Sequence, residues 1–441
     1  MKDLKYKIVV VLLLVFTITS CEDFLGGDIN ADPNKPGDVP VSAQLPNVQI
    51  VLADITGGDW SRFNCMLMQQ VEGVARQWSS FNQYNGLQPS DFDAAWQNIY
   101  ENALVELNIM EASTREDGNN HYLGVVNVLK AYTLMMATDV WGDIPYTEAA
   151  LGAENISPNY DDQATVIYPE IFALLNEAIT LFGGAAGPVV PGSEDVYYGG
   201  TISNWIKAAT ALRARANLHQ GNYAAALTDA QSSFESAADN LSFQYDASNA
   251  AQWFRFNRDR TGDLQFHPFM KGLMEDLNDT RVDQFSPTFE QHADHPYLID
   301  AYEQELISYR EIKFIEAECL LRTSGSAADL REAYLAAIQA SFEEVGLGNE
   351  EYSTYVQQDA IDPGEGNITE NNIMIQKYIG LFAQPEVFSD WRRTDIPILT
   401  PVSGSVVPVR WNYSADEFLF NENAPPESEV TLFTPKVDWD N

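Results

Sequence analysis

The sequence predicts a mainly α-helical protein with long irregular loops. Three observations lead to this prediction. Apolar residues recur at three- and four-residue spacing through most of the chain, strand signals are few, and two helix pairs carry the small residues that let helices approach closely. The best strand candidate is Val406–Val409, and Pro408 weakens it because proline cannot donate a ladder hydrogen bond.

The helical segments follow one another along the chain and are separated by loops. In 203–219, for example, Trp205, Ala208 and Leu212 fall on one face. The predicted helices are 43–56, 62–80, 92–112, 121–138, 163–182, 203–219, 222–236, 264–277, 303–323, 327–344 and 369–383. The segments between them are rich in Gly, Pro, Asn, Asp and aromatic residues, and loops this long are usually functional: 139–162, 183–202, 237–263, 278–302 and 393–441.

Two of these helix pairs have repeat character. Residues 203–236 form a helix, a turn at Gly221 and a second helix, and residues 306–344 repeat the scheme around a turn at Gly325. The period is close to the ~34 residues of tetratricopeptide repeats. Because the connections between units are long and irregular, we expect tetratricopeptide-like helix pairs within one body rather than a regular solenoid.

The charge balance excludes two classes of partner. The chain has 441 residues, with 64 acidic against 25 basic side chains and a formal net charge of −39. So negative a body repels phosphates and anionic lipid, which disfavours nucleic-acid binding and direct membrane adsorption. The aromatic content of 12% argues against disorder.

The N-terminus resembles a bacterial lipoprotein signal. Lysines at the start precede an apolar run, Ile8–Ile18, too short to span ~30 Å of hydrocarbon. Cys21 follows a small residue, as in a lipobox, which implies cleavage before it and lipidation of its thiol. Glu22 and Asp23 then resemble the surface-export signal of Bacteroidetes lipoproteins. We therefore expect a signal peptide over 1–20, a lipidated tether over 21–40 and one helical domain over 41–441; ordinary signal cleavage is the alternative.

The other two cysteines, Cys65 and Cys319, lie in apolar helical patterns. Two thiols in so long an exported chain do not make a disulfide framework. We expect two buried free cysteines, and a single bridge between them is the alternative.

Two aromatic clusters are candidates for ligand binding. The first contains Trp78, Phe81, Tyr84 and Asn85, and the second contains Trp253, Phe254 and Arg255 within 253–260. Aromatic faces stack on sugar rings, while amide side chains satisfy hydroxyl groups. Alternatively, the aromatic residues close the core beneath their loops. The three arginines of the second cluster pair internally or bind an acidic ligand group, and we favour internal pairing.

Metal and cofactor signals are weak. His292 and His295 have metal-ligand spacing, but no third ligand is close in sequence. Asp28, Asn30 and Asp32 alternate like the start of a calcium loop, yet Pro33 stands where such a loop needs glycine. We predict neither a cofactor nor a metal.

Several segments resemble the SusD/RagB-like outer-membrane lipoproteins. Residues 139–149 resemble the family's WGDIPYTEA segment, and residues 375–382 with 390–394 and Pro397 resemble its C-terminal block; residues 32–36 fit the same family. The resemblance is strongest to the shorter, nutrient-binding subgroup. Within these blocks we expect Trp141, Asp143, Trp391, Arg392 and Arg393 to lock loops through buried hydrogen bonds rather than to touch ligand.

The resemblance implies a fold and a function. The fold would be SusD-like, with tetratricopeptide-like helix pairs. The protein would be a non-enzymatic surface lipoprotein of the outer membrane that binds an oligosaccharide and delivers it to a SusC-like TonB-dependent transporter. Three alternatives stay open: a peptide-binding member of the same family, an exported glycoside hydrolase, for which the sequence selects no acid–base pair, and a helical-repeat scaffold that binds only protein.

Overall fold

Two long helical segments open the body. In the computed structural model, which describes residues 39–151, 155–285 and 296–440, both segments contain a π-helical stretch. The first is kinked at Gly58 (φ −83°, ψ −132°). The first consists of α3 (Val41–Ile55), η2 (Thr56–Trp60) and α4 (Ser61–Leu67), and the second of η3 (Pro89–Phe92), α6 (Asp93–Gln97), η4 (Asn98–Leu104) and α7 (Val105–Asp117).

The centre of the body is the helix α8 (Asn120–Trp141), which is followed by η6 (Gln163–Ile167) and α9 (Tyr168–Phe182). By length and composition alone, α8 and the Gln163–Phe182 segment are each long and apolar enough to cross a membrane. The most apolar window of α8 is buried inside the body over its whole length, so α8 is a core helix.

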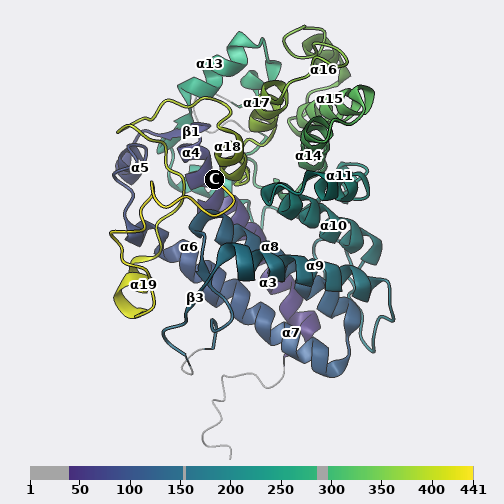
Figure 1. The fold of residues 1–441 in the computed structure, drawn as a ribbon, viewed down its shortest axis with the longest axis vertical. Coiled ribbons are helices and arrows are strands. Elements are labelled where there is room, and N and C mark those ends of the chain that lie inside the picture. Colours follow the sequence, from purple (N-terminus) through teal and green to yellow (C-terminus); the bar gives the residue numbers. More distant parts are fainter. Residues whose placement is uncertain (1–38, 152–154, 286–295, 441) are drawn as a thin grey trace, which may run out of the picture. The chain divides into compact units, whose positions relative to one another are not determined.

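A stack of paired helices follows α8. In order, α8, α9, α10, α11, α14 and α15 each pack against the next (Figure 1). The predicted repeat-like pairs are confirmed, and left-handed Gly221 (φ 68°) makes the turn of the first. Their bounds are α10 (Ile202–His219) with α11 (Tyr223–Gln231), and α14 (Tyr309–Arg322) with α15 (Ala327–Glu344).

In the described part of the chain, three short antiparallel sheets join separate segments. They pair β1 (Val71–Gly73) with β5 (Leu264–Phe266), β2 (Ile144–Pro145) with β3 (Tyr160–Asp161), and β4 (Leu241–Gln244) with β6 (Glu303–Ile307). Three predicted helices are therefore wrong in part, because 62–80 contains β1, 264–277 begins with β5, and 303–323 begins with β6. Each strand is too short for its alternation to outweigh the neighbouring helical pattern.

The remaining helices are mostly short, and several lie in segments that we predicted to be loops. They are α5 (Arg76–Phe81), η7 (Ala237–Asp239), α12 (Gln252–Asp259), α13 (Pro268–Asp276), η8 (Thr280–Asp283), α16 (Asn349–Tyr355), α17 (Glu370–Gly380), α18 (Val387–Thr394) and α19 (Ala415–Phe420). The predicted strand at Val406–Val409 does not form. The fold class itself, mainly α-helical with long irregular loops, is confirmed.

The two body cysteines are free and buried, as expected. Burial raises the pKa of Cys65 and of Cys319 to about 12. The predicted signal peptide, Cys21 and the histidine pair His292/His295 lie outside the described residues.

Candidate ligand-binding site

The structure brings the two predicted aromatic clusters together. β1 and β5 pair with Val71 opposite Phe266, which places α5 beside α12 although the two helices are far apart in sequence. The rings of Trp78 and Phe256 then meet edge to face, with their centroids 5.1 Å apart. One aromatic surface is thus formed from both clusters.

The backbone around the first cluster is strained. Gln69, Arg76 and Tyr84 all have left-handed φ angles, of 58°, 50° and 58°. Each such residue costs on the order of 1–3 kcal/mol and persists only where the surroundings hold it. Gln69 Nε2 donates to the carbonyl oxygen of Thr400 at 2.6 Å, and Arg76 Nε lies 2.6 Å from the carboxylate of buried Asp263.

The close approach of α5 to β1 requires a glycine. A Cβ atom on Gly73 would lie only 1.9 Å from the carbonyl oxygen of Trp78. The Gly73 amide also donates to Asn82 Oδ1 at 3.3 Å. The strand and the cluster therefore form one unit.

The predicted site residues divide into a buried floor and an accessible rim. Trp78, Tyr84 and Trp253 are only 4%, 1% and 1% exposed, and Trp253 Nε1 donates to Ser61 Oγ at 3.0 Å. The accessible rim contains residues that are half-buried or exposed: Phe81, Asn85, Phe254 and Arg255. Direct ligand contact by any of these residues stays a prediction.

Arg255 and Arg258 of the second cluster pair internally, as favoured, whereas Arg260 forms no ion pair within the described residues. Arg255 Nη2 lies 3.2 Å from Asp54 Oδ2, and Arg258 Nε lies 2.7 Å from Asp259 Oδ1. The Asp54 carboxylate also accepts a hydrogen bond from the Tyr245 hydroxyl at 2.5 Å. Asp54 therefore contacts this cluster and also lines the neighbouring cavity.

A cavity of about 330 Å³ opens beside the joined clusters. We call it the Arg62 cavity. Both π-helical stretches, η2 and η4, contribute to its walls, and such π-bulges are frequent at functional sites. Its lining residues are Val51, Asp54, Ile55, Gly58, Asp59, Trp60, Arg62, Ala95, Asn98, Asn102 and Gln252.

The side chain of Arg62 is the unusual member of this lining. It is 9% exposed, and its Nη2 lies 2.7 Å from Asp59 Oδ1. Its guanidinium stacks over the Phe256 ring at 4.7 Å, which joins the cavity to the aromatic clusters. Nε and Nη1 are buried without a hydrogen-bond partner in the described part of the chain. Leaving such donors unsatisfied is costly.

Sequence reasoning missed Arg62, because the segment 62–80 showed only an apolar helical pattern around it. The charges at the cavity balance, with Arg62 and Arg255 against Asp54 and Asp59. Guanidinium N–H groups donate, carboxylates accept, and the amides of Asn98, Asn102 and Gln252 do both. Such an arrangement can bind a neutral polyhydroxylated molecule.

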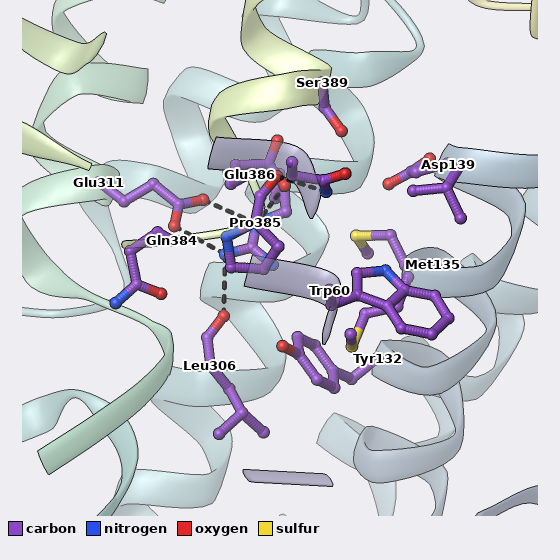
Figure 2. Close-up of a pocket in the computed structure, with 14 residues that line it drawn as sticks. Trp60, Tyr132, Met135, Asp139, Leu306, Glu311, Gln384, Pro385, Glu386 and Ser389 are labelled. Carbon is purple, nitrogen blue, oxygen red and sulfur yellow. Dashed lines mark hydrogen bonds and ion pairs between the residues drawn. The ribbon is translucent and has the colours of Figure 1, made fainter. Parts of the chain in front are cut away.

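A second, smaller cavity lies in the core. Its volume is about 30 Å³, room for one or two water molecules only. Glu311 and Glu386 approach it from one side, and Trp60, Tyr132 and Met135 from the other (Figure 2). Arg215 holds Glu311 through two hydrogen bonds of 2.7 and 2.6 Å.

His219 connects this core network to the C-terminal segment. Its Nδ1 lies 3.2 Å from Asp139 Oδ2 and its Nε2 lies 2.7 Å from Glu386 Oε1. Burial opposes a charge on the ring, but Asp139 and Glu386 outweigh it and raise the pKa of His219 to about 9. The Trp439 indole stacks on the imidazole, with centroids 5.1 Å apart.

Among the described residues, two groups of side chains have the donor atoms of a metal site. Asp139, His219 and Glu386 form the first, but they already hold one another in the ion-pair network. The second is exposed and contains Asp143, Asp162 and Asp438. Exposed carboxylates commonly lie close together without an ion. We therefore propose a metal ion at neither group.

The family-like blocks have in part the locking role that we expected, because Arg392 and Arg393 form buried contacts whereas Asp143 is exposed. Arg392 donates to the carbonyl oxygens of Val409 and Asp139, at 3.1 and 2.5 Å. Arg393 pairs with Glu318 at 2.8 Å and with Asp390 at 2.6 Å. These buried contacts join α18 to α8 and α14.

The stacked helix pairs, with a cavity whose lining residues all lie in helices, define a helical-repeat protein. A family model described as "Starch-binding associating with outer membrane" matches residues 33–297 and 295–414. The chain therefore belongs to the SusD-like family. No curated protein matches it significantly.

Solved structures share the fold over nearly their whole length. A SusD/RagB family protein of Bacteroides thetaiotaomicron VPI-5482 is 20% identical, with a TM-score of 0.72 over 91% of this chain and 99% of that one. A chitin-binding protein is 21% identical, with a TM-score of 0.72 over 91% and 100%. A SusD homolog from Bacteroides uniformis ATCC 8492 is 19% identical, with a TM-score of 0.70 over 92% and 100%.

Proposed function

We propose that this protein is a surface lipoprotein of the outer membrane that binds an oligosaccharide nutrient and delivers it to a SusC-like TonB-dependent transporter. Residues 1–20 are its signal peptide, Cys21 carries the lipid, 21–40 form the tether and 41–441 form the binding domain. Several acyl chains, each contributing ~0.8 kcal/mol per buried CH₂, would anchor a body whose acidity repels the membrane surface.

The Arg62 cavity is the observation that best supports an oligosaccharide as the ligand. Its buried guanidinium has two unused donors, while Asp54 and Asp59 supply acceptors nearby. A sugar hydroxyl donates and accepts at once, so it matches this pairing better than an anion does. Phe81 and Phe254, at the rim, offer aromatic surface for the apolar faces of sugar rings. The description of the family as starch-binding and of one structural relative as chitin-binding supports a glycan.

We infer binding without catalysis. A glycoside hydrolase needs a protonated carboxylic acid and a carboxylate on either side of the scissile bond. In the Arg62 cavity Asp54 pairs with Arg255 and Asp59 pairs with Arg62. This arrangement favours acceptance of hydrogen bonds over donation of a proton.

The test is a calorimetric screen of polysaccharides, their oligomers and peptides against the purified chain, with product analysis after long incubation. We expect a glycan to bind without turnover, and Arg62→Met to weaken binding by ~10-fold or more through the lost charge-assisted hydrogen bonds. Arg62→Lys keeps the charge but loses the planar fork, so it should restore binding only in part.

The matched control is Arg258→Gln, an exposed arginine on α12 that is paired with its neighbour Asp259. Thermal unfolding of every variant separates lost binding from lost structure. Released sugar would favour the hydrolase, and binding restricted to peptides would favour the peptide-binding alternative. Glycan affinity that is unchanged in folded Arg62→Met would refute the Arg62 cavity as the site.

A further inference from the structure

A further cavity lies on another face of the α6–η4 segment, which also lines the Arg62 cavity. The chemistry of its lining is different. The cavity measures about 300 Å³, at the lower end of the ~300–1,000 Å³ typical of small-ligand pockets. We call it the Trp96 cavity. It is lined by Asp93, Trp96, Gln97, Tyr100, Glu101, Pro145, Ala149, Ala150, Pro158, Ser414, Asp416 and Glu417. These residues come mainly from α6, η4 and α19, of which α6 and α19 are labelled in Figure 1.

The Arg62 and Trp96 cavities are lined by different faces of the α6–η4 segment. Ala95, Asn98 and Asn102 face the Arg62 cavity, whereas Trp96 and Tyr100 face the other. The inference therefore does not rest on the proposed function, because it concerns different side chains of the segment.

The first feature of the Trp96 cavity is uncompensated negative charge. Four carboxylates line it, and among the described residues its lining contains neither lysine nor arginine. Within the described residues these carboxylates accept hydrogen bonds from neutral groups only, as Glu417 does from the Tyr160 hydroxyl at 2.8 Å and Glu101 from Gln97 Nε2 at 2.8 Å. Burial, and after it the charge of Glu417, raise the pKa of Tyr100 well above its usual value. A protonated amine is attracted to such a field.

The second feature is independent of the carboxylates. Trp96 is only 8% exposed and lines the cavity, yet its indole Nε1 donates to no residue in the described part of the chain. Its ring packs against that of Tyr100 at a tilt of 33°, with centroids 4.6 Å apart. An unused donor on an aromatic wall indicates a ligand that brings an acceptor and an apolar face.

We propose that the Trp96 cavity binds an amino sugar, with its ammonium group among the carboxylates and a ring hydroxyl accepting from the Trp96 indole. An amino sugar carries hydroxyl oxygens directly beside its amine, so one small ring satisfies both features. A lysine side chain satisfies only the first, because four methylene groups separate its ammonium from the nearest acceptor. The aromatic pair adds a cation–π contribution.

The experiment is calorimetric titration of the purified full chain with glucosamine, at low ionic strength and at a pH where the amine is protonated. N-Acetylglucosamine is the neutral counterpart, and capped lysinamide tests the amine without the sugar. We expect a glucosamine Kd on the order of 1 mM, at least ~10-fold weaker binding of the other two compounds, and weakening of glucosamine binding by salt.

The variants locate the site. Glu101→Gln with Glu417→Gln keeps hydrogen-bond acceptors and removes two charges, so it should lower glucosamine affinity at least ~10-fold. The matched control is Glu116→Gln with Asp117→Asn, two exposed acidic residues on α7. Trp96→Phe keeps the ring and removes the donor, and we expect a several-fold loss.

The outcomes separate this inference from the proposed function. Glucosamine binding that is lost in the cavity variant but kept in Arg62→Met and in the control supports an amino-sugar site here. Equal affinity for glucosamine and its N-acetyl form, equal affinity for capped lysinamide, or equal loss in the control pair would overturn it. Undetectable glucosamine binding would overturn it as well, and would leave the Arg62 cavity untouched.

Discussion

Replacement of Trp78 by alanine should destabilise the domain strongly, even though the residue lies in a predicted ligand cluster. Trp78 is 4% exposed and packs against Phe63, Phe81 and Phe256, with centroid distances of 5.5, 5.6 and 5.1 Å. Its Nε1 has no hydrogen-bond partner in the described residues, so the loss is one of packing. A buried tryptophan truncated to alanine typically costs ~3–5 kcal/mol.

The expected shift in melting temperature follows from the size of the domain. At ~2.1 cal/mol/K per residue, a body of ~400 residues has an unfolding entropy near ~0.8 kcal/mol/K, so the melting temperature should fall by ~4–6 °C. Scanning calorimetry measures this shift, and urea unfolding measures the free energy directly.

The neighbouring Gln77→Ala is the matched control, because Gln77 is exposed on the same helix. Trp78→Phe should lie between the wild type and the alanine variant, since it keeps an aromatic ring. A loss below ~1 kcal/mol for Trp78→Ala would refute the packing argument. If glycan affinity also fell in a variant that stayed folded, Trp78 would belong to the ligand site as well as to its floor.

Three further predictions concern buried charges and thiols. In the folded protein the pKa of His219 is raised from its ordinary 6.5 to about 9. The contribution of His219 to the stability of the fold is therefore complete below pH 6.5 and is lost as the pH rises through 9. Urea unfolding across that window should show a weaker pH dependence for His219→Gln than for the wild type. Arg281→Leu leaves fully buried Asp279 without its 2.6 Å partner and should cost ~3–5 kcal/mol; Asp279→Asn in the same chain should recover part of that loss, and no recovery would contradict the pairing argument. In a Cys21→Ser variant, Cys65 and Cys319 should react with a thiol reagent only after denaturation; fast labelling of the native protein would contradict their burial.

Much of the helical framework could be predicted from local sequence. The segment predicted at 327–344 coincides with α15 (Ala327–Glu344), and the one predicted at 163–182 coincides with η6 and α9. A helix buries one stripe, and that stripe recurs every three or four residues along the chain. Helix pairing follows from short connections such as the turn at Gly221.

The site could be predicted only in part. Sequence spacing identified both aromatic clusters, but it did not predict that β1 and β5 would join them. Two three-residue strands carry too little alternation to be recognised, and their pairing is non-local. Arg62 was missed for a related reason: a charged residue in a helical pattern looks solvated until the ring of Phe256 is known to cover it.

By itself, the sequence determined the α-helical class, the repeat-like pairs and the family, because each depends on local periodicity or on ordered blocks of residues. It favoured free thiols, but only the tertiary structure decided that Cys65 and Cys319 are not bridged. Only the tertiary structure decided which aromatic side chains are floor and which are rim, and which charges remain unpaired beside a cavity. Burial and pairing depend on neighbours that are remote in sequence. The Trp96 and Arg62 cavities, on two faces of one helical segment, arise from that long-range packing.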